Sequence, residues 1–137
     1  TDIRSEKISH LQLNPWAEIA WYFTKTREQF RLAGTIQVVT DQDQKSCFYG
    51  ERDQTWQSLS DAARSQFLWS YPAQQRDPNL ANFNPPKPDP KYPVKNFVLL
   101  IFNVHQVDHL ELRGNPQNRY IYQQDESQNW QKLEVNP

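Results

Sequence analysis

A continuous apolar run, Phe97–Asn103 (FVLLIFN), limits the possible folds more than any other segment of the chain. It is far shorter than the ~20 residues of a membrane-spanning helix, and it is typical of a strand buried on both faces. Because strand–helix–strand alternation is missing, the chain is predicted to be mostly antiparallel β, and a small barrel suits it better than a doubly wound sheet. The other predicted strands are Trp16–Phe23, Gln29–Thr40, Val107–Leu112, Arg119–Gln123 and Trp130–Val135.

Two short helices are predicted beside the strands. The first covers Arg4–Leu13 and ends before Pro15, because proline cannot continue the hydrogen-bond ladder. The second follows a polar loop through Asp41–Asp53; it starts at the capping-box sequence Ser58–Asp61 and ends before Pro72. The predicted fold class is therefore mainly β with two short helices (α+β).

Prolines are concentrated in one segment, since Pro72–Pro93 holds seven of the ten. This composition predicts an extended loop rather than a helix or a strand. A domain boundary in the loop would leave pieces too small to fold separately. We therefore expect residues 1–137 to form one domain.

Composition narrows the possible partners and the compartment. A net charge of −1 provides no field that would attract nucleic acid, and no segment has the pattern of a membrane helix or a signal peptide. The single cysteine, Cys47, cannot form an internal disulfide, so a cytoplasmic location is expected. The mean hydropathy is low at −0.93, but five Trp, six Tyr and seven Phe supply area for a modest core.

Familiar catalytic motifs are missing from the sequence. Three glycines cannot form a dinucleotide fingerprint or a glycine-rich phosphate loop. The three histidines, His10, His105 and His109, do not have metal-binding spacing, so no metal site is expected. His105 and His109 are interpreted as surface or edge positions. No serine elbow or carboxylate pair is present either, and no catalytic residue is assigned.

The opening segment, Thr1–Lys7 (TDIRSEK), places two cations and two hydroxyls at the entry of the first predicted helix. The helix dipole is positive at that end, so Arg4 and Lys7 are favourable there if an anion such as phosphate binds beside them. Alternatively, Asp2 and Glu6 neutralise the two cations on a solvated helix start.

Gln29 is a second candidate contact, on one face of the strand Gln29–Thr40 together with Arg31. Its amide could hydrogen-bond a planar heterocycle through both donor and acceptor atoms. A solvent-facing glutamine is the more common case, and both interpretations stay open on the residues alone.

Together, several segments resemble the pyridoxamine phosphate oxidase-like FMN-binding proteins, and most of all the subgroup that is common in cyanobacteria. These segments are TDIRSEK, NPWAEIAWYF, REQFRLAG, SDAARSQF and the C-terminal block that begins VDHLELRG. The resemblance extends over nearly the whole chain in order. It implies a split β-barrel homodimer that binds two FMN molecules at the subunit interface.

The resemblance also implies the cofactor contacts. The family's T-N-x-x-S-R-K segment holds the flavin phosphate, and it matches Thr1–Lys7, with Glu6 in place of the arginine and Arg4 as a possible compensation. Gln29 matches a strand glutamine that contacts the flavin ring. The implied cofactor-binding residues are Thr1, Arg4, Ser5, Lys7, Gln29 and Arg119.

Two departures lie in the C-terminal block. The family's F-W-Q-G segment, whose tryptophan approaches FMN, matches Glu111–Gly114 (ELRG), which has no tryptophan. The R-L-H-D-R segment that binds pyridoxal phosphate matches Arg119–Gln123, where Ile121 and Gln123 replace the histidine and the second arginine. The loss of these donors disfavours oxidation of vitamin B6 phosphates and leaves FMN binding unaffected.

A third departure is length. The family has strands before the position of Thr1, including an arginine that reaches the FMN phosphate. We expect this chain to be a portion of a longer protein whose N-terminal strands are not included.

The leading hypothesis is an FMN-dependent oxidoreductase that acts as a homodimer on an unidentified small substrate. The isoalloxazine ring supplies the redox chemistry, so no catalytic side-chain pair is required. The alternatives are a genuine pyridoxamine/pyridoxine phosphate oxidase and a non-catalytic FMN-binding or interaction protein.

Overall fold

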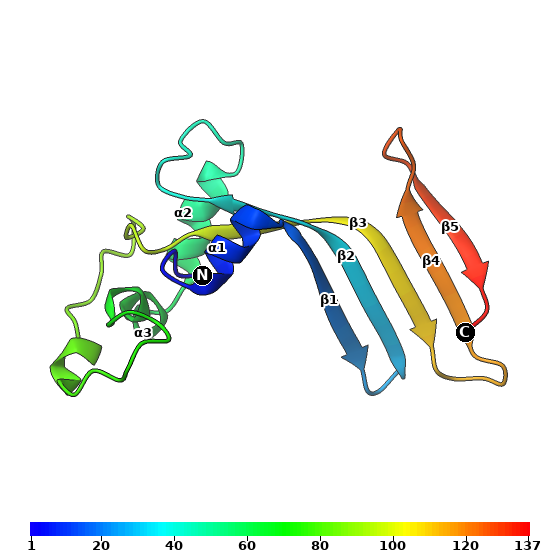
Figure 1. Ribbon diagram of the computed structural model, residues 1–137, viewed down its shortest axis with the longest axis horizontal. Helices are drawn as coiled ribbons and strands as arrows, with labels where there is room; N and C mark the ends of the chain where they lie inside the picture. Colours follow the sequence, from blue (N-terminus) through cyan, green and yellow to red (C-terminus); the bar gives the residue numbers. More distant parts are fainter. The chain divides into compact units, whose positions relative to one another are not determined.

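The computed structural model describes all of residues 1–137 and is mainly β, as predicted (Figure 1). One five-stranded sheet has the order β1-β2-β3-β4-β5. Two short 3-10 turns lie at Gln66–Leu68 and Leu80–Phe83. The helices and strands are α1 (Glu6–Leu13), β1 (Trp16–Phe23), β2 (Glu28–Val39), α2 (Tyr49–Ser58), α3 (Asp61–Ser65), β3 (Leu99–Glu111), β4 (Asn118–Gln124) and β5 (Trp130–Val135).

The chain divides into two compact units. The helical unit consists of residues 1–14 and 37–101, and the sheet unit consists of residues 15–36 and 102–137. Strands β2 and β3 have residues in both units. The expectation of a single domain stays a prediction.

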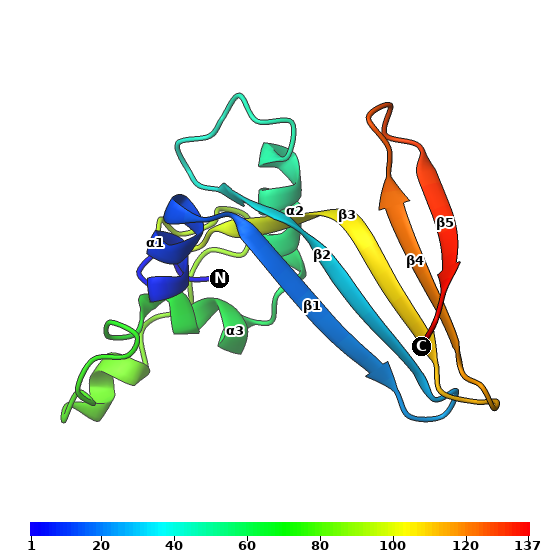
Figure 2. The ribbon, with the colours of Figure 1, turned by 45° about the vertical axis from the view of Figure 1, so that its right-hand side comes forward.

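Strands β1 and β2 of the sheet unit form the predicted hairpin, with pairs from Trp16↔Thr35 to Phe23↔Glu28. Strand β1 has the predicted bounds, and β2 begins one residue earlier than predicted. Strands β3, β4 and β5 continue as an antiparallel meander (Figure 2). The hairpin and meander follow from period-two patterns separated by short turns, which are local signals.

Strand β3 corrects one prediction. Phe97–Asn103 and Val107–Leu112 were expected as two strands, but Leu99–Glu111 is one continuous strand. Its neighbours in the sheet are β2 on one side and β4 on the other. Backbone hydrogen bonds from both neighbouring strands continue the strand through its polar residues. A hydrophobicity pattern alone predicts that the strand ends at those residues.

Helix α2 corrects a second prediction, because its first turns lie in the expected loop Asp41–Asp53. Its buried residues are Arg52 and Trp56, one turn apart. The Arg52 guanidinium donates to the carbonyls of Phe97 and Val94 over 2.9–3.3 Å. An arginine therefore occupies the inward face of this polar helix. For that reason the sequence shows no apolar periodicity that would predict the helix. The structure thus has three α-helices rather than two.

The two predicted helices have shorter bounds than expected. Helix α1 ends at Leu13 as predicted but begins at Glu6, two residues after Arg4. Ser60 caps helix α3 through a 3.2 Å bond from the Ala63 amide, and the helix ends at Ser65. The segment 72–93 is the predicted loop except for the 3-10 turn at Leu80–Phe83.

The core of the helical unit fixes the start of the chain. Trp56 is fully buried, with its ring centroid 5.3 Å from that of Phe97. The segment before α1 pairs antiparallel with Asn96–Val98: the Val98 amide donates to the Thr1 carbonyl and the Ile3 amide to the Asn96 carbonyl. Thr1 is therefore held against a buried part of the chain. None of the helices has the length and apolar character needed to cross a bilayer.

Candidate functional site

Three of the predicted phosphate contacts converge at the start of helix α1. The Lys7 ammonium Nζ lies 3.3 Å from Thr1 Oγ1 and 3.0 Å from Ser5 Oγ. Ser5 is the N-cap residue, yet its hydroxyl makes no capping bond to the helix. One cation and two hydroxyls thus lie together near solvent, and this donor set suits a phosphate oxygen.

Arg4, the fourth predicted contact in this segment, points elsewhere. Its guanidinium pairs with Asp2 at 2.7 Å and donates to the carbonyls of Trp69 and Phe67. Burial acts to raise the pKa of Asp2, but the hydrogen bonds and charge of Arg4 outweigh it and hold that pKa below its ordinary value. The alternative interpretation, in which Asp2 neutralises a cation, therefore holds for Arg4.

A hollow of about 510 Å³ lies next to this segment in the helical unit, a size that suits a small molecule. Its wall includes Thr1, Arg4 and much of the segment 66–77. Trp69 lies in the wall with its indole Nε1 buried and without a hydrogen-bond partner. No local pattern predicts this hollow, because its wall joins the start of the chain to residues 66–77, although Trp69 and Tyr71 beside Pro72 were a visible signal.

The other two predicted contacts lie together in the sheet unit. Gln29 on β2 and Arg119 on β4 line one hollow of about 220 Å³, together with Arg31, Asp108 and Leu110. Arg119 forms a two-bond ion pair with Asp108 at 2.7 and 3.0 Å. The hydrogen bond from Arg119 holds the pKa of Asp108 below its usual value. Strand alternation therefore brings Gln29, Arg31 and Arg119 to one polar face.

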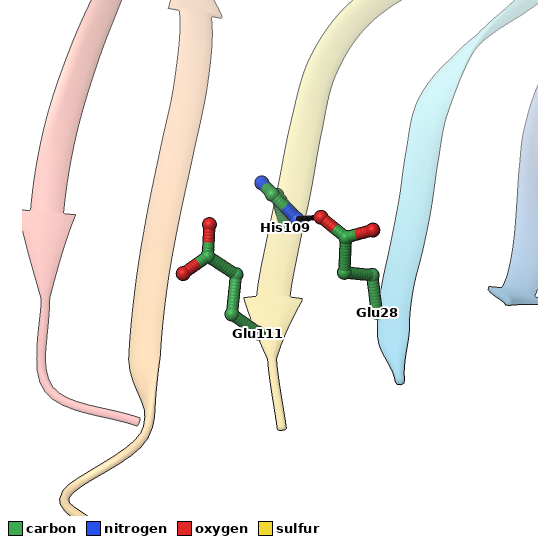
Figure 3. A group of neighbouring side chains, drawn as sticks. All are labelled: Glu28, His109 and Glu111. Carbon is green, nitrogen blue, oxygen red and sulfur yellow. Dashed lines mark hydrogen bonds and ion pairs between the residues drawn. The ribbon is translucent and has the colours of Figure 1, made fainter. Parts of the chain in front are cut away.

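The opposite face holds a cluster that sequence analysis did not identify, formed by Glu28, His109 and Glu111 (Figure 3). His109 was interpreted as a surface or edge position, but it is 9% exposed, on the middle strand of the sheet. Its Nε2 lies 3.2 Å from Glu28 Oε1, and its ring stacks on Phe30. Glu28 and His109 are far apart in sequence, so no local spacing revealed the cluster.

Comparison with protein families and sequences gives two matches. Residues 1–40 match the model of the family described as "Pyridoxamine 5'-phosphate oxidase, FMN-binding domain". The chain is 32% identical over 117 residues to pyridoxine/pyridoxamine 5'-phosphate oxidase 2 of Arabidopsis thaliana. That alignment covers 84% of this chain but 58% of the plant protein, so the chain spans little more than half the length of that relative.

Two solved structures extend the comparison. A pyridoxamine 5'-phosphate oxidase-related, FMN-binding protein from Nostoc punctiforme is 49% identical, with a TM-score of 0.94, and the match covers 100% of this chain and 71% of that one. PhzG from Burkholderia lata, solved in complex with tetrahydrophenazine-1-carboxylic acid, shares the fold at 18% identity and a TM-score of 0.78, over 100% of this chain and 66% of its own. The predicted split-barrel class is confirmed. The chain therefore belongs to the pyridoxamine 5'-phosphate oxidase-related family, whose cofactor is FMN.

Proposed function

We propose that this protein binds FMN and acts as an oxidoreductase on a small substrate. The observation that supports this most is the convergence of Thr1, Ser5 and Lys7, within the residues that match the FMN-binding family model. Bound FMN supplies the redox chemistry through its isoalloxazine ring, and the residues of this chain bind and orient it.

The phosphate of FMN is proposed to contact the Lys7 ammonium and the hydroxyls of Thr1 and Ser5. All three donors lie within 3.3 Å of a neighbour in the group, so little rearrangement is needed. Arg4 is proposed to assist indirectly, because its pair with Asp2 and its bond to the Trp69 carbonyl brace the segment.

Gln29 and Arg119 are proposed as contacts to the flavin itself. The Gln29 amide offers a donor and an acceptor, which suits the alternating polar atoms of a heterocycle edge. The ion pair with Asp108 uses Nε and Nη2 of Arg119, so the Nη1 donors remain for a ligand oxygen.

We further propose that the protein is a homodimer. Strand β1 ends the sheet order and exposes large apolar side chains, among them Trp21 at 58% and Tyr22 at 48%. An uncovered aromatic edge strand promotes association, and a second copy of the chain would remove it from water.

A second candidate function is oxidation of pyridoxamine or pyridoxine phosphate, which the name of the Arabidopsis relative suggests. Strand alternation places Ile121 and Gln123 on the same face of β4 as Arg119. Ile121 and Gln123 stand where the family has a histidine and a second arginine, so this face lacks two hydrogen-bond donors. Binding of a phosphorylated vitamin is therefore expected to be weak. Turnover of pyridoxamine phosphate by the FMN-loaded protein would favour this candidate. A non-catalytic FMN carrier would bind FMN and oxidise no tested substrate.

The lone cysteine supports the proposal of a cytoplasmic protein. Cys47 is a free, exposed thiol. Such a thiol persists most readily in a reducing compartment.

The test is reconstitution with FMN, desalting and an absorbance spectrum. We expect one retained FMN per chain. Lys7→Gln should weaken binding at least about tenfold, because one charge-assisted contact to phosphate is lost. The control is Lys45→Gln, which removes the same charge from an exposed loop and should bind like the wild type. A wild-type protein that stays colourless with added FMN would refute the proposal.

A further inference from the structure

The cluster Glu28, His109 and Glu111 has the composition of a metal site. One potential ligand atom from each side chain lies within 4.8 Å of the other two. His109 and Glu111 are two residues apart on β3 and therefore share a face, and Glu28 comes from the neighbouring strand β2 (Figure 3). Two adjacent strands of one sheet thus place three potential ligand atoms within 4.8 Å of one another.

The spacing of the first two ligand atoms suits a tetrahedral ion. His109 Nε2 and Glu28 Oε1 are 3.2 Å apart. Two ligands at zinc distances and a tetrahedral angle are about 3.3 Å apart. The remaining ligand, Glu111, would approach by a side-chain rotation that releases its Oε2 from the Asn118 amide.

Each ligand is also held in place by a second group. The His109 ring lies flat on Phe30, at 4.2 Å between centroids and 9° between planes. The Asn118 amide donates to Glu111 Oε2 at 3.0 Å, and the Thr26 hydroxyl donates to the Glu28 carboxylate. Supporting hydrogen bonds of this kind orient the ligands in metal sites.

Solvent can reach the cluster. A hollow of about 360 Å³ is lined by Lys25, Thr26, Glu28, Glu111 and Arg113, so water could complete the coordination. The two cations in this wall oppose a metal ion and limit its affinity. Arg113 donates to the Lys25 carbonyl at 2.7 Å, which turns its guanidinium toward the backbone.

We propose that Glu28, His109 and Glu111 bind one divalent ion of the zinc class. An imidazole ligand disfavours Mg²⁺ and Ca²⁺, which prefer all-oxygen sites, and the lack of a thiolate disfavours Cu(I). Two carboxylates and one imidazole form a three-ligand zinc site with a position open to water. This inference is independent of FMN binding.

The test is calorimetric titration of Zn²⁺ into the purified chain after chelator treatment and desalting, with metal content measured in parallel. We expect one zinc per chain. Glu28→Gln and Glu111→Gln should each weaken binding by at least about tenfold. Glu134→Gln, the matched control on exposed β5, should leave the affinity unchanged.

Three further variants keep the result interpretable. Cys47→Ser and His10→Asn remove exposed residues that could bind zinc adventitiously, and zinc binding should persist in both. Arg113→Gln should tighten zinc binding severalfold, because a repelling charge is removed. This gain cannot arise from misfolding. If the wild type shows no saturable zinc binding in the micromolar range, or if both glutamine variants bind zinc as it does, Glu28 and His109 form only a hydrogen bond and the proposal is wrong.

Discussion

Arg4 and Lys7 belong to one segment but meet different partners, and this difference sets their roles. Lys7 is exposed and bonds two hydroxyls, which a bound anion can share. Arg4 is 13% exposed and is already paired with Asp2, which is 16% exposed. The charge of Arg4 is already matched by Asp2, whereas the Lys7 ammonium has only hydroxyl partners and remains available to an anionic ligand.

The Asp2–Arg4 pair leads to a prediction about pH. Asp2→Asn should lower the free energy of unfolding at pH 7 by about 1–2 kcal/mol, because a charge-assisted hydrogen bond is lost. The folded pKa of Asp2 lies below its ordinary value, so the unfolded chain binds the proton more readily. The stabilisation is complete above about pH 5 and disappears as the pH falls through the folded pKa.

Urea unfolding of both proteins across this pH range measures the effect. The gap between wild type and Asp2→Asn should close under acid conditions. If the difference in unfolding free energy stays constant down to the lowest pH at which both proteins fold, the ionised carboxylate of Asp2 does not provide the stabilisation.

At the scale of elements, the contact between β2 and β3 depends on a single glycine. A Cβ at Gly34 would lie 2.0 Å from the carbonyl oxygen of Asn103, and that oxygen belongs to the backbone of the neighbouring strand. The two strands approach more closely there than any side chain allows. The continuous strand β3 therefore requires glycine at this position of β2.

Two glycine substitutions test this point as a matched pair. Gly34→Ala should destabilise the protein by about 3 kcal/mol, because the backbone must shift to remove the clash. Gly50→Ala, in helix α2, meets nothing within 4 Å and should be neutral or stabilising by up to about 1 kcal/mol. Thermal and denaturant unfolding compare the two variants. Equal stabilities would contradict the close approach of the strands.

At the scale of the whole molecule, several aromatic side chains of β1, the strand that ends the sheet order, are exposed. Trp21 and Phe23 stack at 5.0 Å between centroids, while 58% and 39% of their surfaces remain exposed. A row of this kind on an edge strand is typical of an interface between subunits.

Trp21→Glu should therefore convert the proposed dimer to monomers, because it places a charge in an apolar interface. Light scattering after size-exclusion chromatography gives the mass directly. Leu80→Glu is the control, since it adds the same charge at an exposed apolar residue in the segment 72–93. A monomeric wild type at all concentrations would contradict the dimer proposal.

The parts of this protein that could be predicted from its sequence depend on neighbours along the chain. The bounds of β1 and β5, the β1–β2 hairpin, the Ser60 start of α3 and the grouping of Thr1, Ser5 and Lys7 follow from period-two alternation, helix capping and adjacency. The protein family could also be predicted from the sequence, because its motifs are short contiguous segments.

Tertiary structure decided the parts that depend on distant residues. Helix α2 is stabilised by the bonds of Arg52 to carbonyls more than 40 residues away, so its own pattern is polar. Arg4 does not join the group of Thr1, Ser5 and Lys7, because its guanidinium pairs with Asp2 and donates to carbonyls of the segment before Pro72. Glu28 and His109 meet only because β2 and β3 are neighbours in the sheet, 81 residues apart in the chain. Long-range pairing leaves no periodic trace in the sequence, and it requires the folded chain to bring the partners together.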